Sequence, residues 1–334
     1  MSQPVQPSAT EPVEADLLII GAGPTGLYAA YYAGFRGLKV AVLDSLPEIG
    51  GQITAMYPEK MIYDVAGFPA VKGQDLVDAL GEQAAQFDPV YLLGHRAEQL
   101  EHTDESVTVT CDTGLSVHAK VVLISGGIGT FSPRPLPAAD AFTGEGVMFF
   151  VPRLAELADL DVLIVGGGDS AFDWAMSLEP LAKTVTLVHR RDKFRAHEHT
   201  VQRVLASNVE VITSAEVTAL RGNGRVESAD IVGKLDGALR TVPTQAVVAA
   251  LGFVADLGPM SRWGLEQRKR HILVDSSMRT NLTRVFAAGD IADYDGKVKL
   301  IATGFGEAAT AVNNAMTVID PSAKVFPGHS SDSG

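Results

Sequence analysis

The alternation of hydrophobic and polar positions predicts two copies of one strand–helix–strand unit in this chain. The continuous apolar run at residues 17–20 predicts a strand that is buried on both faces of a parallel sheet. A helix is predicted over 28–35, where glycines end it, and a second strand over 39–43. The second copy has the same elements, predicted over 162–165, 170–178 and 184–188. The pattern therefore predicts an α/β fold with two Rossmann-like dinucleotide-binding domains.

Three glycines follow the first strand directly, in the spacing of a dinucleotide-binding turn. We expect Gly21 to form the tight turn, Gly23 to let the backbone approach a pyrophosphate, and Gly26 to let the helix pack closely on the strand. The second strand ends at Asp44, a carboxylate that can hold ribose hydroxyls. Because strand, glycines, helix, strand and acid come in this order, we assign these residues and Thr25 to a cofactor site.

The second copy carries the related turn G-x-G-x-x-A, in which Gly166 and Gly168 are followed by Ala171. Asp169 and Ser170 lie where the predicted helix begins, and the backbone N–H groups of a helix N-terminus favour phosphate. We therefore assign the two glycines, Asp169 and Ser170 to a second cofactor site.

The residue at the ribose position distinguishes the two sites. Asp44 follows the first glycine of its motif by 23 positions, and the residue at the same distance in the second copy is His189. Arg190 and Arg191 follow it, and Arg195 lies in the same loop. A carboxylate would repel a 2′-phosphate, whereas cationic side chains bind it. The first site therefore suits an adenosine with free ribose hydroxyls, and the second suits NADPH.

Further elements are predicted between and after the two units. An amphipathic helix is expected over 73–87. Short alternating strands predict one β-meander insertion, and the region from 201 to 254 predicts another. A strand over 285–288 leads to Asp290, and a helix is expected from about Gly306 to Val318. The strands of the first meander are predicted at 90–93, 96–102, 107–111 and 115–120, followed by a buried strand at 121–124.

Composition narrows the function further. The net charge of −13 over 334 residues argues against nucleic-acid binding, and no apolar run is long enough to span a membrane. The N-terminus lacks the features of a secretory signal, and the single cysteine, Cys111, excludes an intramolecular disulfide and suits a cytoplasmic protein. His197 and His199 flank Glu198, but alternate residues of a strand point to opposite faces, so we expect no metal site there.

Two segments leave alternatives open. The loop after Asp44 is either a plain connection or a cofactor-binding loop in which Gly50 and Gly51 approach the cofactor, with Gln52 and Tyr57 beside it. The segment 262–270 is rich in Arg and Lys, and it is either a solvated surface or a docking face for an acidic partner.

The chain resembles the flavoproteins related to low-molecular-weight thioredoxin reductase. The resemblance lies in the two glycine-rich motifs and in the segments HRRDKFRA and FAAGD. Thioredoxin reductase carries a CxxC pair of cysteines. The corresponding segment of this chain, GVMFFVPRL, has no cysteine. The chain resembles more closely the thioredoxin-reductase-like ferredoxin–NADP⁺ reductases of bacteria. Four segments carry this resemblance: SLPEIGGQITAMYPEKMIYDVAGFP, GGGDSAFDWA, RWGL and GKVKLIATGFGEAATAVNNA.

This resemblance implies the cofactors FAD and NADPH and a role for individual residues. Asp44 would hold the FAD ribose, Gln52 would lie near the flavin, and Tyr57 would stack on it as a catalytic residue. Ala97 and Phe131 would border the cofactor, and Asp290 would bind the ribityl chain. The partner subunit's His329 would cover the other flavin face as a second catalytic residue, and Ser331 would reach the cofactor.

The resemblance also implies the domain order and the activity. We expect a disordered N-terminus at 1–14, an FAD-binding domain in two parts at 15–129 and 254–320, an NADPH-binding domain at 130–253, and a tail at 321–334 that covers the flavin in a homodimer. The expected enzyme passes a hydride from NADPH to the flavin and then single electrons to ferredoxin. The alternatives are a reductase of flavodoxin, a quinone or an external disulfide, or a non-catalytic NADP(H) sensor.

Overall fold

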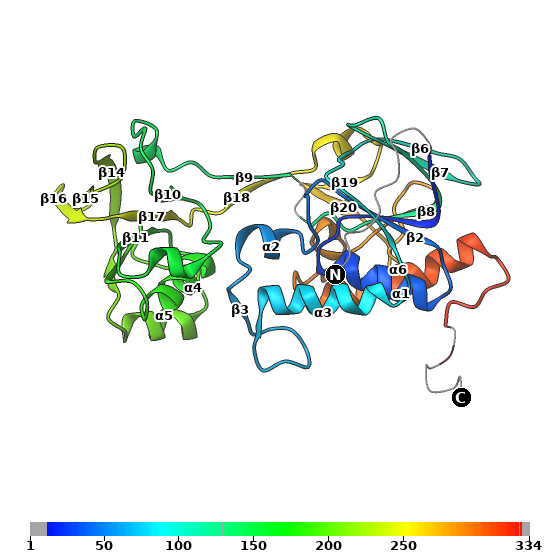
Figure 1. The fold of residues 1–334 in the computed structure, drawn as a ribbon, viewed down its shortest axis with the longest axis horizontal. Coiled ribbons are helices and arrows are strands. Elements are labelled where there is room, and N and C mark those ends of the chain that lie inside the picture. The colour runs from blue at the N-terminus through cyan, green and yellow to red at the C-terminus, as the bar shows by residue number, and fades with distance from the viewer. Residues whose placement is uncertain (1–11, 128–129, 327, 329–334) are drawn as a thin grey trace. The chain divides into compact units, whose positions relative to one another are not determined.

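The computed structural model describes residues 12–127, 130–326 and 328, and its chain divides into two compact units (Figure 1). Among the described residues, the first unit comprises those up to 55, those from 61 to 130 and those from 255 onward, and the second comprises 56–60 and 131–254. The short segment 56–60 therefore belongs to the second unit, whereas the sequence places it within the first domain. The strands β9 (Thr130–Pro133) and β18 (Phe253–Asp256), where the chain passes between the units, pair with each other.

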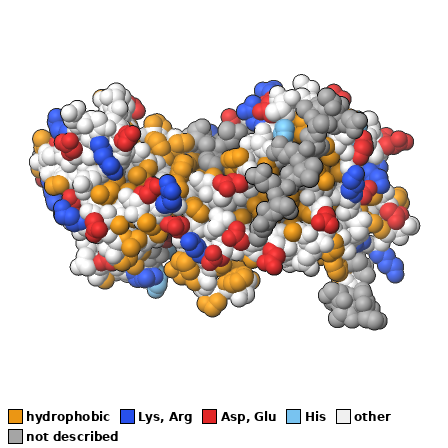
Figure 2. Space-filling model, viewed as in Figure 1, with side chains coloured by type: hydrophobic (Ala, Val, Ile, Leu, Met, Phe, Trp, Pro, Cys, Tyr) orange, Lys and Arg blue, Asp and Glu red, His pale blue; other side chains and the backbone are white. Residues whose placement is uncertain are grey.

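The surface carries both signs of charge. On the face drawn in Figure 2, the side chains of Lys and Arg are interspersed with those of Asp and Glu over the described residues. No helix in the described part of the chain is long and apolar enough to cross a membrane.

A seven-stranded sheet organises the first unit, in the order β5-β2-β1-β8-β7-β6 with β21 also paired to β8. The strands β5, β2, β1, β8 and β21 are parallel, and the meander strands β7 and β6 run antiparallel. The strands span Val13–Ile20 (β1), Val40–Asp44 (β2), Val90–Leu93 (β5), Ala97–His102 (β6), Val107–Cys111 (β7), Ser116–Ile124 (β8) and Val285–Ala287 (β21).

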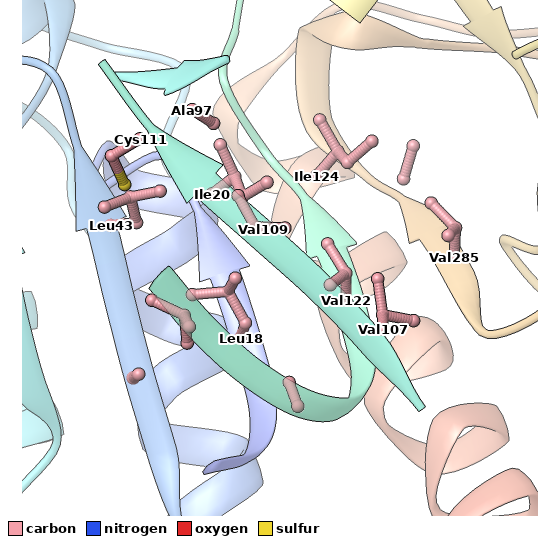
Figure 3. Close-up of a cluster of buried hydrophobic side chains, with 14 of the residues drawn as sticks. Leu18, Ile20, Leu43, Ala97, Val107, Val109, Cys111, Val122, Ile124 and Val285 are labelled. Atoms are coloured by element: carbon pink, nitrogen blue, oxygen red, sulfur yellow. The ribbon is translucent and has the colours of Figure 1, made fainter. Parts of the chain in front are cut away.

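Helices cover one face of this sheet, and the meander encloses a second core on the other. The helices α1 (Pro24–Phe35), α3 (Gly73–Ala85) and α6 (Ile301–Ile319) lie together, with α1 in contact with both others (Figure 1). On the opposite face, Leu18, Ile20 and Leu43 point toward Val109 and Cys111 of the meander (Figure 3). The two cores bury the central strands on both faces, as their continuous apolar sequences predict.

The second unit repeats this plan with a five-stranded parallel sheet in the order β10-β17-β11-β12-β13. The helices α4 (Asp169–Leu178) and α5 (Glu198–Leu205) contact each other and share one core with the sheet. The antiparallel strands β14 (Ala215–Arg221), β15 (Ser228–Gly233) and β16 (Leu239–Pro243) belong to a second core. The sheet strands span Val147–Met148 (β10), Asp161–Val165 (β11), Thr184–Val188 (β12), Glu210–Ile212 (β13) and Ala246–Ala249 (β17).

Short elements complete the two units. The helices are α2 (Gln52–Met56) and four 3₁₀ turns, η1 (Pro137–Ala139), η2 (Leu154–Leu157), η3 (Gly258–Arg262) and η4 (Gly289–Ile291). The strands are β3 (Met61–Ile62), β4 (Val71–Lys72), β19 (Gln267–Arg268), β20 (His271–Leu273) and β22 (Ala292–Asp293).

Several predicted elements differ from the structure. The strand at 90–93 was expected in the meander but is a parallel strand beside β2, and the strands expected at 115–120 and 121–124 are one strand, β8. Residues 198–205 form the helix α5, not part of a meander. The last helix begins at Ile301, five residues before the predicted Gly306. Its glycines, which suggested a turn, lie inside the helix.

Candidate functional site

The register of the first sheet brings four strand ends together. Ile20 of β1 pairs with Leu43 of β2 and with Ile124 of β8, and Ile124 also pairs with Ala287 of β21. The residues that follow these strands therefore leave the sheet at the same edge. Open parallel sheets bind ligands at this carboxyl edge, so the register itself defines a candidate site.

Two of the three glycines in the first turn leave no room for a side chain, and the third has open space beside it. Gly21 has a φ of +114°, and a Cβ at this position would lie 2.6 Å from the carbonyl oxygen of Ser125. A Cβ on Gly26 would lie 1.8 Å from the carbonyl oxygen of Gly21, so α1 packs against the turn only with glycine there. Gly23 has nothing within 4 Å of a Cβ position, and its backbone therefore faces open space at the start of α1. This opening fits the approach of a pyrophosphate.

Asp44 fixes the same turn from the end of β2. Its Oδ2 accepts a hydrogen bond from Ala22 N–H at 2.6 Å, and its Oδ1 accepts one from Leu46 N–H at 2.8 Å. Burial raises the pKa of Asp44, although these hydrogen bonds oppose the shift. A carboxylate has about four acceptor positions, so acceptor capacity remains for a ribose hydroxyl.

The loop after Asp44 packs on the glycine-rich turn. Gly50 N–H donates to the carbonyl oxygen of Ala22 at 2.8 Å, and a Cβ on Gly51 would lie 3.1 Å from the Cα of Gly23. The Gln52 amide nitrogen approaches Gly127, where a Cβ would lie 2.9 Å from it. The loop is thus part of the site's wall, which favours the cofactor-binding alternative over a plain connection.

Two further predicted residues, Ala97 and Asp290, come from other segments of the first unit. His95 N–H donates to the carbonyl oxygen of Asp44 at 3.0 Å, so the segment that leads to Ala97 lies beside the end of β2. Asp290 lies in η4, directly after β21 and Gly289. Thr25 packs between two glycines, since its Oγ1 lies 2.9 Å from a Cβ position on Gly289 and 2.4 Å from one on Gly304.

The second unit holds a separate cavity of about 820 Å³ at the carboxyl edge of its own sheet. Val165 of β11 pairs with Val188 of β12 and with Ala249 of β17, so the residues after these strands line it. The predicted site residues that line the cavity are Gly166, Gly168, Asp169, Ser170, His189, Arg190, Arg191 and Arg195. The structure therefore brings together every residue of this predicted set.

The glycine geometry of the second unit repeats that of the first. A Cβ on Gly166 would lie 2.5 Å from the carbonyl oxygen of Ala250, whereas Gly168 has nothing within 4 Å at the start of α4. Asp169 Oδ1 accepts a hydrogen bond from His197 N–H at 2.8 Å, and Arg195 N–H donates to the carbonyl oxygen of Gly167 at 2.7 Å. The arginine-rich loop is thereby tied to the glycine-rich turn at two points.

The cavity is rich in positive charge, but His189 is not its source. The His189 ring packs against Gly167 and lies 5.6 Å from the Phe194 ring. Burial lowers the pKa of His189, and a hydrogen bond to the Lys193 carbonyl oxygen opposes the shift. The neighbouring arginines lower the pKa further, so the neutral ring is favoured at pH 7. The exposed arginines, none of which forms an ion pair with a described acid, carry the charge.

Tyr57 lies in the second unit. Its ring is half-buried against the core that contains α4, and the Lys60 ammonium lies 5.6 Å from the ring centre. Lys60 forms an ion pair with Asp173 of α4 at 2.5 Å, and Glu59 Oε2 accepts a hydrogen bond from Leu154 N–H at 2.7 Å. These contacts anchor the segment 56–60.

Other predicted residues are described only in part. His329 and Ser331 lie outside the described residues, and Phe131 is described only as part of β9. His197 and His199 do not lie in a strand, as was predicted: His197 precedes α5 and His199 lies in it.

Sequence reasoning missed two sets of residues. Arg134 lines the cavity of the second unit from a segment that the prolines mark only as a linker. Glu307 and Lys297 form a buried ion pair beside Asp290. The signal for Glu307 is its position among small buried residues of one helix face, Gly304, Ala308 and Ala311.

Comparison with known proteins agrees with this geometry. Two units, each with a glycine-rich turn at the carboxyl edge of a parallel sheet, define a protein with two dinucleotide sites. The family model described as pyridine nucleotide-disulphide oxidoreductase matches residues 15–315. The chain belongs to this family.

The relatives within the family are reductases. A protein of Nocardioides sp. named Ferredoxin–NADP reductase is 66% identical over 324 residues, which cover 96% of this chain and 98% of that protein. Proteins with the same name from Frankia alni (64%; 94% and 98% covered) and, with the number 2, from Shouchella clausii (50%; 94% and 96% covered) also match. These relatives confirm the resemblance identified in the sequence.

Solved structures share the fold. Thioredoxin reductase from T. acidophilum matches with a TM-score of 0.79 at 25% identity, over 92% of this chain and 99% of that one. Thioredoxin reductase from Lactococcus lactis matches with a TM-score of 0.77 at 25% identity, over 91% and 99%. The predicted thioredoxin-reductase-like α/β fold is confirmed.

Proposed function

We propose that this chain is an FAD-dependent ferredoxin–NADP⁺ reductase, which transfers electrons between NADPH and ferredoxin. The observation that carries the proposal is the 50–66% identity, over nearly the whole chain, to proteins named Ferredoxin–NADP reductase. The two glycine-rich sites supply the binding chemistry that this activity requires.

The first unit fits FAD. Gly23 leaves its backbone open for the pyrophosphate, and Asp44 has acceptor positions left for the adenosine ribose. Asp290 is proposed to bind the ribityl chain, and Gln52 to lie beside the flavin. The first domain is therefore proposed to be the FAD-binding domain, with Gly21, Thr25, Gly26, Ala97 and Phe131 as further cofactor-binding residues.

The second unit fits NADPH. Gly168 is open at the N-terminus of α4, where a pyrophosphate binds. Arg190, Arg191 and Arg195 supply positive charge for the 2′-phosphate, and a carboxylate is absent from the ribose position.

Bound FAD supplies the conversion between a two-electron and a one-electron carrier. The chain's own residues bind and orient the two cofactors and exclude competing oxidants. Tyr57 remains the residue that we propose to contact the flavin ring.

The single cysteine argues against a disulfide substrate. Cys111 is buried in the meander core, and burial raises the pKa of its thiol to about 11. It therefore does not form the thiolate that disulfide exchange requires. Flavodoxin and quinones are the alternative electron acceptors.

A basic hairpin is the proposed contact for ferredoxin. Arg262 pairs with Glu98 at 3.8 Å, and Arg268 pairs with Asp295 at 3.0 Å, so much of the basic segment is neutralised. Lys269 and Arg270 are exposed at the turn between β19 and β20. They are free to meet an acidic partner, and electron transfer to ferredoxin should then slow as salt rises.

We further propose a cytoplasmic homodimer. The residues 321–334 would form the tail that covers the flavin. In it, the partner subunit's His329 would lie on the flavin face opposite Tyr57, and Ser331 would contact the cofactor.

The visible spectrum of the purified protein tests the proposal. We expect flavin bands that bleach when NADPH is added without oxygen and return when excess oxidised ferredoxin is added. Parallel titrations with flavodoxin and a quinone identify the acceptor. A colourless protein that does not take up added FAD would contradict the proposal and favour an NADP(H) sensor.

A further inference from the structure

A buried ion pair lies directly behind the turn that carries Asp290. The side chains of Lys297 and Glu307 are only 3% and 5% exposed, and they contact each other. Glu307 is in the second turn of α6, and Lys297 lies in the loop that precedes this helix.

The pair holds both polar backbone groups of Gly289. Gly289 N–H donates to Glu307 Oε2 at 2.7 Å, and Lys297 Nζ donates to the Gly289 carbonyl oxygen at 3.0 Å. The carbonyl belongs to the peptide bond that joins Gly289 to Asp290. Two charged side chains therefore hold the backbone directly before Asp290.

Tyr294 completes the network. Its hydroxyl donates to Glu307 Oε1 at 2.7 Å, and its ring centre lies 5.5 Å from the Lys297 ammonium. Burial and the Glu307 carboxylate raise the pKa of Tyr294 to about 12, so the hydroxyl remains a donor. Each charge in the network is thus hydrogen-bonded as well as paired, which a buried ion pair requires.

The same turn is packed against the first glycine-rich motif. Gly289 has a φ of +79°, and the Thr25 hydroxyl occupies the space that side chains on Gly289 or Gly304 would need. The network therefore links three parts of one site: the start of α1, the Asp290 turn and the start of α6.

We propose that Lys297 and Glu307 are positioning residues for FAD, which hold the two peptide groups on either side of Gly289 so that the Asp290 carboxylate is kept in place for the ribityl chain. The inference rests on the proposed function, because it assumes that FAD binds in the first unit. A pair of apolar side chains would stabilise a core at least as well as an ion pair. Apolar side chains, however, offer neither a donor for the Gly289 carbonyl nor an acceptor for its N–H.

FAD titration of the apoprotein tests this role. We expect Lys297→Met and Glu307→Gln each to raise the FAD dissociation constant at least tenfold and to leave the dissociation constant for NADP⁺ unchanged. Lys120→Met is the matched control, because Lys120 pairs with Asp16 in the same unit but is half exposed and far from Gly289 in the sheet. It should leave FAD affinity unchanged.

Coupling to Asp290 separates positioning from general stability. If Lys297 acts through Asp290, Lys297→Met should raise the dissociation constant less in an Asp290→Asn background than in the wild type. Multiplication of the two separate effects would overturn the inference, and so would single variants with wild-type affinity.

A charge-neutral double variant, Lys297→Met with Glu307→Gln, covers the case in which a single variant fails to fold. It leaves no unpaired buried charge, so it should fold, but FAD affinity should stay at least tenfold weaker because the Gly289 carbonyl lacks its donor. Wild-type affinity in the double variant would overturn the inference. A wild-type protein that fails to bind FAD at all would instead overturn the proposed function.

Discussion

Substitution of Asp44 by asparagine tests the hydrogen bonds that hold the glycine-rich turn of the first unit. The carboxylate uses both oxygens, one for Ala22 N–H and one for Leu46 N–H. Asparagine keeps one oxygen, so its NH₂ group must face one of the two donors. The variant therefore leaves one backbone N–H of the cofactor-binding turn without an acceptor.

The size of the effect follows from this loss. A hydrogen bond to a charged group contributes about 1.5–3 kcal/mol to stability. Burial disfavours the ionised Asp44 carboxylate, so a neutral asparagine avoids this cost and offsets part of the lost hydrogen-bond energy. We expect the free energy of unfolding of the apoprotein to fall by about 1–2 kcal/mol. Because Asp44 is also proposed to hold the FAD ribose, we expect the FAD dissociation constant to rise about 10- to 100-fold.

Denaturant unfolding of the apoprotein and fluorescence titration with FAD measure the two effects. Asp275→Asn is the matched control, because Asp275 also accepts two backbone hydrogen bonds, from Ser277 and Arg279, but both on its Oδ1. Asparagine can keep both, so this control should change neither quantity. An Asp44→Asn protein that matches the wild type in both measurements would refute the reasoning.

Three further predictions concern the second unit. Arg190→Ala combined with Arg191→Ala should raise the KM for NADPH at least tenfold and spare NADH; equal losses for both nucleotides in steady-state assays would contradict the phosphate assignment. Gly167→Ala should lower the thermal unfolding temperature and weaken NADP⁺ binding, since its Cβ would lie 2.3 Å from the His189 ring. Unchanged calorimetry and NADP⁺ titration would show that the ring moves freely. Burial alone would raise the pKa of Asp161, but hydrogen bonds and a nearby lysine lower it below its ordinary value of 3.8. Its contribution to stability is therefore present above that value and lost as the pH falls through the lowered pKa, so Asp161→Asn should flatten the acid side of the melting curve against pH.

The sequence alone determined the two dinucleotide units, and it predicted a different nucleotide for each. These depend on local constraints: Gly21 and Gly26 have no room for a side chain, and a strand must precede them. The equal spacing to Asp44 and His189 is a property of one βαβ unit, so it is visible without the tertiary structure. The charge of the second site was also predictable, although the sequence did not show that His189 is neutral.

Element boundaries failed where packing overrides local pattern. Gly304 and Gly306 suggested a turn, but both lie inside α6, where the absence of a side chain on Gly304 leaves room for the Thr25 hydroxyl. The strand β5 has the short apolar pattern of a meander strand, and only its pairing with β2 distinguishes the two. The spacing of apolar residues and the composition of a segment do not show which strand it pairs with.

Only the tertiary structure decided which distant residues act together. The segment 56–60 belongs to the second unit because Lys60 and Glu59 find their partners in Asp173 and Leu154. Lys297 and Glu307 meet at Gly289 because a helix, a loop and a strand end converge there. Charged residues are ordinarily exposed, so their burial and pairing follow from long-range folding that no local pattern predicts.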